Sequence, residues 1–230
     1  LNGDIHTDDI SGGTGNVNFT NATGGIVLAG DTVILTNAGG NATGGSATFG
    51  SAINGSASGQ ESLVITTTDK PVTLPAIGTG TALESLTVNT SGLVTLNGNI
   101  LTDDNAGTGN VDFSNATGTI TLNADILINT DALAGTTGGS IVFGSAINAA
   151  TAGQQGLTLN TSDDTITLLA AGTTALDYLI ILSAGAVNFN GNVTTSTAGG
   201  SGVVTQVTGS GTTTIAGIIN AASTVSITNN

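Results

Sequence analysis

Side chains that could carry out chemistry are scarce in this sequence. Its 230 residues include 15 Asp and Glu, one Lys and one His, and neither Cys, Met nor Trp. An enzyme usually builds its site from several His, Lys, Arg and acidic residues. The candidates here are His6, Lys70, Glu61, Glu84 and the aspartates. We therefore predict no catalytic cluster, and we expect that the protein is not an enzyme.

Aspartates in turn-like segments are the candidates for a binding site. Calcium prefers several carboxylate and carbonyl oxygens. The aspartates that could supply them are Asp8, Asp9, Asp103, Asp104, Asp131, Asp163 and Asp164. The pairs at 8–9 and 103–104 lie a full sequence repeat apart and cannot share an ion, whereas Asp104 and Asp131 could occupy similar places in adjacent turns. Calcium is thus an alternative to solvated turn aspartates, and no other metal or cofactor is expected.

Composition excludes several other classes of function. Charged residues make up 7% of the chain, against roughly 25% in a typical soluble domain. A basic surface for nucleic acid cannot be built with a single Lys or Arg, and a disulfide or thiolate site needs Cys. No apolar run approaches the ~18 residues of a membrane helix. A polysaccharide-acting enzyme on a β-helix stays a less favoured alternative, because such sites use basic residues and aromatic platforms.

Two surface motifs are also open to a functional interpretation. Threonine arrays can order water on ice-binding solenoids, but the runs at 66–68 and 212–214 do not recur at one position of the repeat, so ice binding is a less favoured alternative. Glycosylation sequons of the form Asn-x-Ser/Thr are numerous. Their number does not exceed what the Asn, Ser and Thr content predicts by chance. They begin at Asn18, Asn21, Asn41, Asn54, Asn89, Asn115, Asn160 and Asn192.

A long internal repeat organises the whole chain. Val17–Phe19 recurs as Val111–Phe113, and the segment 49–54 recurs as 143–148. A third, more diverged copy opens at Phe189. The chain is therefore predicted to be one continuous domain, 1–230, with internal repeats 1–95, 96–188 and a partial 189–230.

A shorter unit lies inside each long repeat. It consists of an apolar-x-apolar strand, a small corner that often reads x-Gly-x, and another apolar residue. The units begin at residues 26, 47, 72, 94, 120, 141, 166, 187 and 213, in steps of 21 to 26 residues. Alternating apolar residues with Val, Ile, Thr and Phe indicate half-buried strands. Regular glycines argue against helices.

These units predict an all-β, single-stranded parallel β-solenoid. Each triangular coil would hold 21–26 residues in three short strands, and four coils would make one repeat of about 94 residues. Coils would stack at the ~4.8 Å spacing of hydrogen-bonded strands. Phe49 and Phe143 would then occupy equivalent inward positions about 19 Å apart along the axis. Asn2, Asn97 and Asn190 at the corners could form ladders of side-chain amides.

Several segments resemble the repeats of filamentous-haemagglutinin-like bacterial surface proteins. The resemblance is carried by 139–148, 153–161 and 186–193, which read GSIVFGSAIN, GQQGLTLNT and AVNFNGNV. It covers nearly the whole chain, although its motifs are degenerate. The resemblance implies a right-handed β-helical shaft from a large secreted adhesin.

The resulting hypothesis is a structural protein that is secreted or displayed on the bacterial cell surface. It would act as a rigid, extended scaffold within a fibre or adhesin. The alternative is a self-assembling filament subunit that stacks end to end in an extracellular matrix or sheath. The expected partners are flanking repeats of a longer chain or further copies, head to tail, and a host or neighbouring cell surface. Neither nucleic acid nor membrane insertion is expected.

Overall fold

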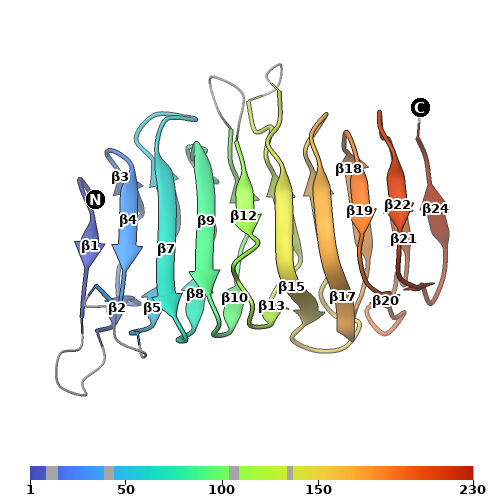
Figure 1. Cartoon of the computed structure of the whole chain (residues 1–230), viewed down its shortest axis with the longest axis horizontal. Coiled ribbons are helices and arrows are strands. Elements are labelled where there is room, and N and C mark those ends of the chain that lie inside the picture. The colour runs from blue at the N-terminus through green and yellow to red at the C-terminus, as the bar shows by residue number, and fades with distance from the viewer. Residues whose placement is uncertain (9–14, 39–43, 104–108, 134–136, 230) are drawn as a thin grey trace.

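A computed structural model describes residues 1–8, 15–38, 44–103, 109–133 and 137–229. The described residues form 24 short strands and no helix. All strand pairs are parallel, and each joins segments roughly one turn of chain apart. Figure 1 shows the strands side by side along the long axis, from β1 beside the N-terminus to β24 beside the C-terminus. The predicted fold class, a parallel β-solenoid, is confirmed.

Each turn of the solenoid has three faces, defined here by their ladders of paired strands. The first face contains β1 (Ile5–His6), β4 (Thr32–Leu35), β7 (Ser62–Thr68), β9 (Ser85–Thr90), β12 (Val111–Phe113), the start of β15 (Ile141–Ala149), the start of β17 (Ile166–Leu176), β19 (Val187–Phe189) and β22 (Thr213–Ile215). The second face contains β2 (Val17–Phe19), β5 (Ala47–Phe49), β8 (Val72–Leu74), β10 (Val94–Leu96), β13 (Ile120–Leu122), the later parts of β15 and β17, β20 (Val193–Thr195) and β23 (Ile219–Asn220).

The third face completes the triangle. It contains β3 (Ile26–Leu28), β6 (Ile53–Gly55), β11 (Ile100–Leu101), β14 (Ile126–Asn129), β16 (Leu157–Asn160), β18 (Leu179–Ser183), β21 (Val204–Gln206) and β24 (Val225–Ile227). Between β6 and β11 the ladder passes through a single residue, Ile77, which bridges Ile53 and Ile100.

The core consists of columns of apolar side chains that run along the axis. On the second face, Val72, Val94, Ile120 and Ile147 are in register, and all four are fully buried. Alternate residues such as Thr95 point outward and are half-buried. Each buried Val, Leu or Ile contributes about 1.5–3 kcal/mol relative to an exposed one, against the entropy of ordering the chain. Because the outward positions need no apolar partner, a sequence rich in Thr, Asn and Gly suits this fold.

One long sequence repeat does not correspond to a whole number of turns, in contrast to the predicted four coils per repeat. The strands β2 to β11, with the bridge residue Ile77, make eleven strand positions before the pattern restarts at β12. Eleven positions on three faces are three turns and two thirds. Equivalent residues therefore move to a new face in each repeat: Val17 is on the second, Val111 on the first and Val204 on the third.

The residues predicted to begin successive units lie on a single face of the solenoid only within two stretches of the sequence. Residues 47, 72, 94 and 120 share the second face, and residues 141, 166, 187 and 213 share the first. The steps from 26 to 47 and from 120 to 141 each cover two thirds of a turn. Turn length also varies more widely than the predicted 21–26 residues. Ile166 and its partner Val187 are 21 residues apart, whereas Thr32 and its partner Leu63 are 31 apart, because some turns carry long connections.

The phenylalanines are buried as predicted but sit on different faces. Phe49 is 4% and Phe143 2% exposed. Phe49 stacks on Phe19 in the second face, with ring centroids 5.7 Å apart, and Phe143 stacks on Phe113 in the first, at 5.6 Å. Their axial separation, three turns and two thirds, corresponds to about 18 Å at the strand spacing. The expectation of equivalent positions on one face is therefore wrong, whereas the inward orientation is confirmed.

A search of the described residues for a helix long and apolar enough to span a membrane finds none.

Candidate functional site

The few side chains that could take part in catalysis or binding are spread along the axis of the solenoid. His6 lies on β1, with its Nε2 4.0 Å from Asp4 on the exposed surface. Lys70 lies about two turns further along, just after β7, and contacts the neighbouring Asp69, with Nζ 2.8 Å from Oδ2. Glu61 is 5% exposed, and its carboxylate accepts hydrogen bonds from the Ser56 hydroxyl at 2.5 Å and the Ala57 N–H at 3.3 Å. Each of these side chains therefore contacts residues that are near it in the sequence, and they do not gather at one site.

Two of the calcium candidates, Asp9 and Asp104, lie outside the described residues, and so the proposed Asp104–Asp131 pair cannot be placed. Asp103 and Asp131 follow Thr102 and Thr130 at the start of two stacked connections. Asp103 is fully buried, and its carboxylate accepts a hydrogen bond from the Leu133 N–H. The Asp131 carboxylate accepts one from the Ser162 hydroxyl. Both carboxylates therefore tie one turn to the next.

The other candidate aspartates differ in their contacts. Asp163 accepts the Gly138 N–H of the preceding turn at 3.1 Å, whereas Asp164 accepts the N–H of the adjacent residue, Thr165, at 2.6 Å. Asp8, at the edge of a described segment, also makes an interaction within the fold. Among the residues that the structure describes, no three His, Cys, Asp or Glu side chains gather in a metal-binding arrangement.

Within the described ranges, a tight turn with a left-handed residue other than glycine occurs once in each full repeat. Thr68 and Ser162 have φ of 58° and 55°, and each precedes an aspartate that accepts a glycine N–H from the turn before. In the first copy, the hydrogen bond from Lys70, followed by that from Gly44, holds the pKa of Asp69 below its ordinary value. A lowered pKa favours the folded state at neutral pH, and this contribution fades as the pH falls through it. Because Asp69 is solvent-exposed, the effect is small.

Corner Asn and Asp side chains form a recurring clamp between turns. In each clamp a side-chain oxygen accepts the backbone N–H of a residue 24 to 31 positions later, in the next turn. The clamps are Asp4–Val33, Asn16–Ser46, Asp31–Ser62, Asn54–Gly80, Asn99–Leu127, Asn110–Ser140, Asp125–Gly156, Asn148–Thr174, Asp177–Ser201 and Asn192–Ile218. Sequence analysis predicted corner amide ladders instead. Among the described residues, two amide–amide contacts join adjacent turns: Asn123 Nδ2 donates to Asn97 Oδ1 at 2.9 Å, and Asn160 Nδ2 donates to Asn129 Oδ1 at 2.8 Å.

Asn110 makes one of the strongest of these clamps, and we expect its loss to be measurable. Its Oδ1 accepts the Ser140 N–H at 2.8 Å and the Ser140 hydroxyl at 2.9 Å, both partly buried. Asn110→Ala should lower the free energy of unfolding by about 1–2 kcal/mol, because a partly buried donor loses its partner. Urea unfolding should show this shift, with Asn115→Ala as an exposed control that changes stability by less than about 0.5 kcal/mol. Equal effects of both variants would contradict the clamp.

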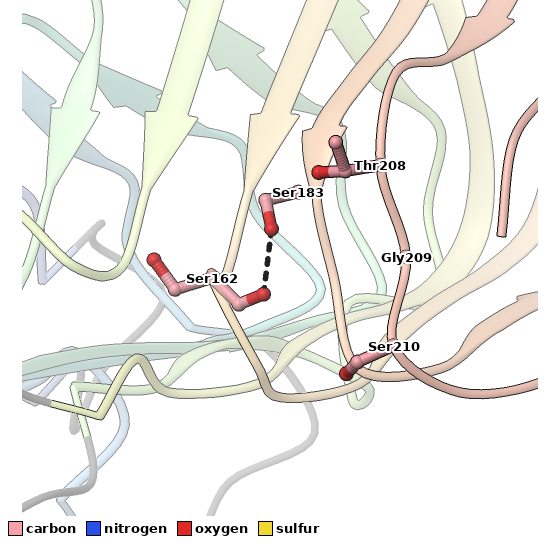
Figure 2. A pocket seen from close by; sticks show the side chains of 5 residues that line it. All are labelled: Ser162, Ser183, Thr208, Gly209 and Ser210. Carbon is pink, nitrogen blue, oxygen red and sulfur yellow. Dashed lines mark hydrogen bonds between the residues drawn. The ribbon is translucent and has the colours of Figure 1, made fainter. Parts of the chain in front are cut away.

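Three surface hollows in the described part of the chain are lined by hydroxyl, amide and apolar residues, without an acidic or basic side chain among them. Figure 2 shows one, lined by Ser162, Ser183, Thr208, Gly209 and Ser210. The Ser183 hydroxyl donates to the Ser162 carbonyl at 2.7 Å, and the Thr208 hydroxyl donates to the Leu182 carbonyl at 2.9 Å. The Ser162 hydroxyl, which also lines this hollow, donates to the Asp131 carboxylate. The bonded hydroxyls of this hollow therefore join adjacent turns.

Two surface features were missed at the sequence level. Tyr178 packs its ring over Gly156, where a Cβ would come within 2.3 Å of it. Burial raises the pKa of the Tyr178 phenol, and the negative charge of Asp125 adds to the shift. The second feature is a row of outward threonines on the second face, in register from turn to turn: Thr48, Thr73, Thr95 and Thr121. The row ends at Asn148, where the sequence repeat shifts to another face.

The polar corner residues described above thus form many hydrogen bonds between adjacent turns. Comparison with known proteins adds no functional assignment: no protein-family model matches the chain, and neither a curated protein nor a solved structure shows significant similarity to it.

Proposed function

We propose that this chain is a segment of a rigid shaft in a secreted or cell-surface bacterial fibre or adhesin. The observation that supports this proposal best is the continuity of the buried columns. From β4 to β19 the first-face ladder has buried inward positions, mainly Ile, Val, Leu and Phe, with threonines at some strand ends. A solenoid without a break in its core resists bending, because bending would open strand pairs along one side.

The contacts between turns suit a load-bearing role. Hydrogen bonds between parallel strands point along the axis, and the corner clamps add side-chain bonds in the same direction. Each turn contacts only its neighbours, so a shaft of this type can be extended by adding repeats without redesigning the core. The sequence resemblance to filamentous-haemagglutinin-like repeats is the basis for placing such a shaft on a bacterial surface.

Immunogold electron microscopy of the producing bacterium tests this proposal. Antibodies raised against the folded 230-residue chain should label intact cells on thin projections, at a distance from the outer surface. Labelling that requires permeabilised cells would overturn the surface location. Pre-immune serum and a strain with the gene deleted serve as controls.

The alternative is a self-assembling filament subunit, in which the last turn would contact another copy. Ile215 and Val225 are 47% and 48% exposed there, although their partners in the preceding turn, Phe189 and Val204, are buried. A further turn, from the same chain or from another copy, would cover this end and pair the open strand edges. Labelled filaments detached from cells, with no label on projections, would favour the filament subunit over the shaft.

A further inference from the structure

Two of the eight Asn-x-Ser/Thr sequons present an exposed side-chain amide that is not used within the fold. Asn21 and Asn115 are exposed, as are the sequon threonines Thr23 and Thr117. Within the described structure, neither asparagine side chain makes a hydrogen bond. We propose that Asn21 and Asn115 are N-glycan acceptor sites of the folded chain.

The two sites share one local structure. The Ala22 N–H donates to the Phe19 carbonyl at 3.0 Å, and the Ala116 N–H donates to the Phe113 carbonyl at 3.0 Å. Each asparagine is therefore the third residue of a tight four-residue turn that begins at a core phenylalanine. The second residue of each turn is held by a side-chain oxygen two positions earlier. These bonds fix the turn backbone while the asparagine amide stays exposed to solvent.

In two other sequons the nucleophilic nitrogen is engaged. Asn89 Nδ2 donates to the Thr66 hydroxyl at 3.2 Å, and Asn160 Nδ2 donates to Asn129 Oδ1 at 2.8 Å. Both lie on strands and are half-buried. A glycan there would have to break an inter-turn bond and displace the neighbouring turn.

Three more sequons use the amide oxygen to hold the backbone. Asn18 accepts the Thr20 N–H at 2.9 Å, Asn54 accepts the Gly80 N–H at 2.8 Å, and Asn192 accepts the Ile218 N–H at 2.9 Å. Such bonds fix the orientation of the amide and restrict its approach to a transferase. The eighth sequon, at Asn41, lies outside the described residues.

The reaction would join the asparagine to a sugar whose anomeric carbon carries a phosphate leaving group. Nδ2 attacks that carbon, a C–N bond forms, and the C–O bond to phosphate breaks with its electron pair leaving on the phosphate oxygen. The amide gives up one proton to a base of the transferase. The donor is a nucleoside-diphosphate sugar or a lipid-pyrophosphate sugar, since both present the same reactive carbon.

The phase of the repeat places the two glycans on different edges of the shaft. Asn21 lies between β2 and β3, where the second face meets the third, and Asn115 lies between β12 and β13, where the first meets the second. A glycan at these corners extends away from both faces, as bulky surface modifications require. This inference goes beyond the shaft proposal and does not depend on it.

Glycosylation of the folded full chain in two parallel reactions tests the inference. One reaction contains a sequon-specific N-glycosyltransferase with a nucleoside-diphosphate hexose, and the other contains an oligosaccharyltransferase with a lipid-pyrophosphate glycan. Intact mass should show two added glycans in at least one reaction, and peptide mapping should place them on Asn21 and Asn115. The productive reaction identifies the donor class.

Variants connect the mass change to the sites. Asn21→Gln and Asn115→Gln should each remove one glycan, whereas Asn89→Gln should remove none. An unmodified folded chain in both reactions, alongside a modified sequon peptide in each, would overturn the inference. Glycans mapped to Asn54, Asn89, Asn160 or Asn192 instead would overturn it as well.

Discussion

Phe143→Ala is expected to destabilise the solenoid by about 3–5 kcal/mol, the usual cost of deleting a buried aromatic ring. Phe143 is 2% exposed and stacks on Phe113, with ring planes 2° apart. The cavity would open inside one turn, between the backbone ladders of β12, β15 and β17, so the flanking turns cannot close over it without losing strand pairing. Urea unfolding should show a lower midpoint. Hydrogen exchange should accelerate first in these three strands.

The matched control is Phe19→Ala. Phe19 also stacks its ring on another phenylalanine, Phe49, but it lies in the first turn and is only partly buried. Its loss should therefore cost less than the loss of Phe143. Equal costs for the two variants, or faster exchange spread evenly over all turns, would argue against a core divided into stacked layers.

The strands themselves were predictable from sequence because the period-two pattern reports burial directly. In β10, for example, Val94 and Leu96 are fully buried and Thr95 is half-buried, as the alternation indicates. Corner glycines mark where each strand ends, and parallel stacking follows from many short strands with few charges. The fold class therefore needed only local information.

The face on which each strand lies could not be predicted from such local information. A strand motif such as Val-x-Phe reveals its inward side chains but not which of three faces it occupies. The faces depend on how many strands precede it, including the single-residue bridge at Ile77, which carries no strand pattern of its own. Counting that bridge gives eleven strand positions per repeat. Only the pairing register shows that Val17 and Val111 lie on different faces.

The roles of the polar corner residues were only partly predictable for the same reason. Sequence analysis identified the aspartates at 103, 131, 163 and 164 as turn residues. The partners of Asp103, Asp131 and Asp163 lie 25 to 31 residues away and come together through the register, whereas Asp164 bonds to the adjacent Thr165. In the described part of the chain, these aspartates accept hydrogen bonds from backbone and hydroxyl donors, and three of the four do so across adjacent turns.

Close approach of adjacent turns makes the corner glycines sensitive to a single added carbon. A Cβ on Gly144 would lie 2.0 Å from the Ser114 carbonyl oxygen and 2.6 Å from its carbon. Both are backbone atoms beside the β12–β15 ladder, so relief requires the turns to separate. Gly144→Ala is expected to cost about 1–3 kcal/mol or more, as for an overpacked core. Thermal unfolding by circular dichroism should record a lower Tm.

Substitutions at two further glycines test whether the close approach of adjacent turns causes the loss of stability. Gly50 is the equivalent residue of the first repeat, and its Cβ would lie 1.9 Å from the Thr20 carbonyl oxygen, so Gly50→Ala should be comparably destabilising although it sits at a different corner. A Cβ on Gly24 would meet nothing within 4 Å, so Gly24→Ala should be neutral, or stabilising by about 0.4–1 kcal/mol through the unfolded chain. If all three variants lowered Tm alike, chain flexibility rather than stacking distance would explain the glycines. A tolerated Gly144→Ala would mean that the turns are further apart than the register of β12 and β15 requires.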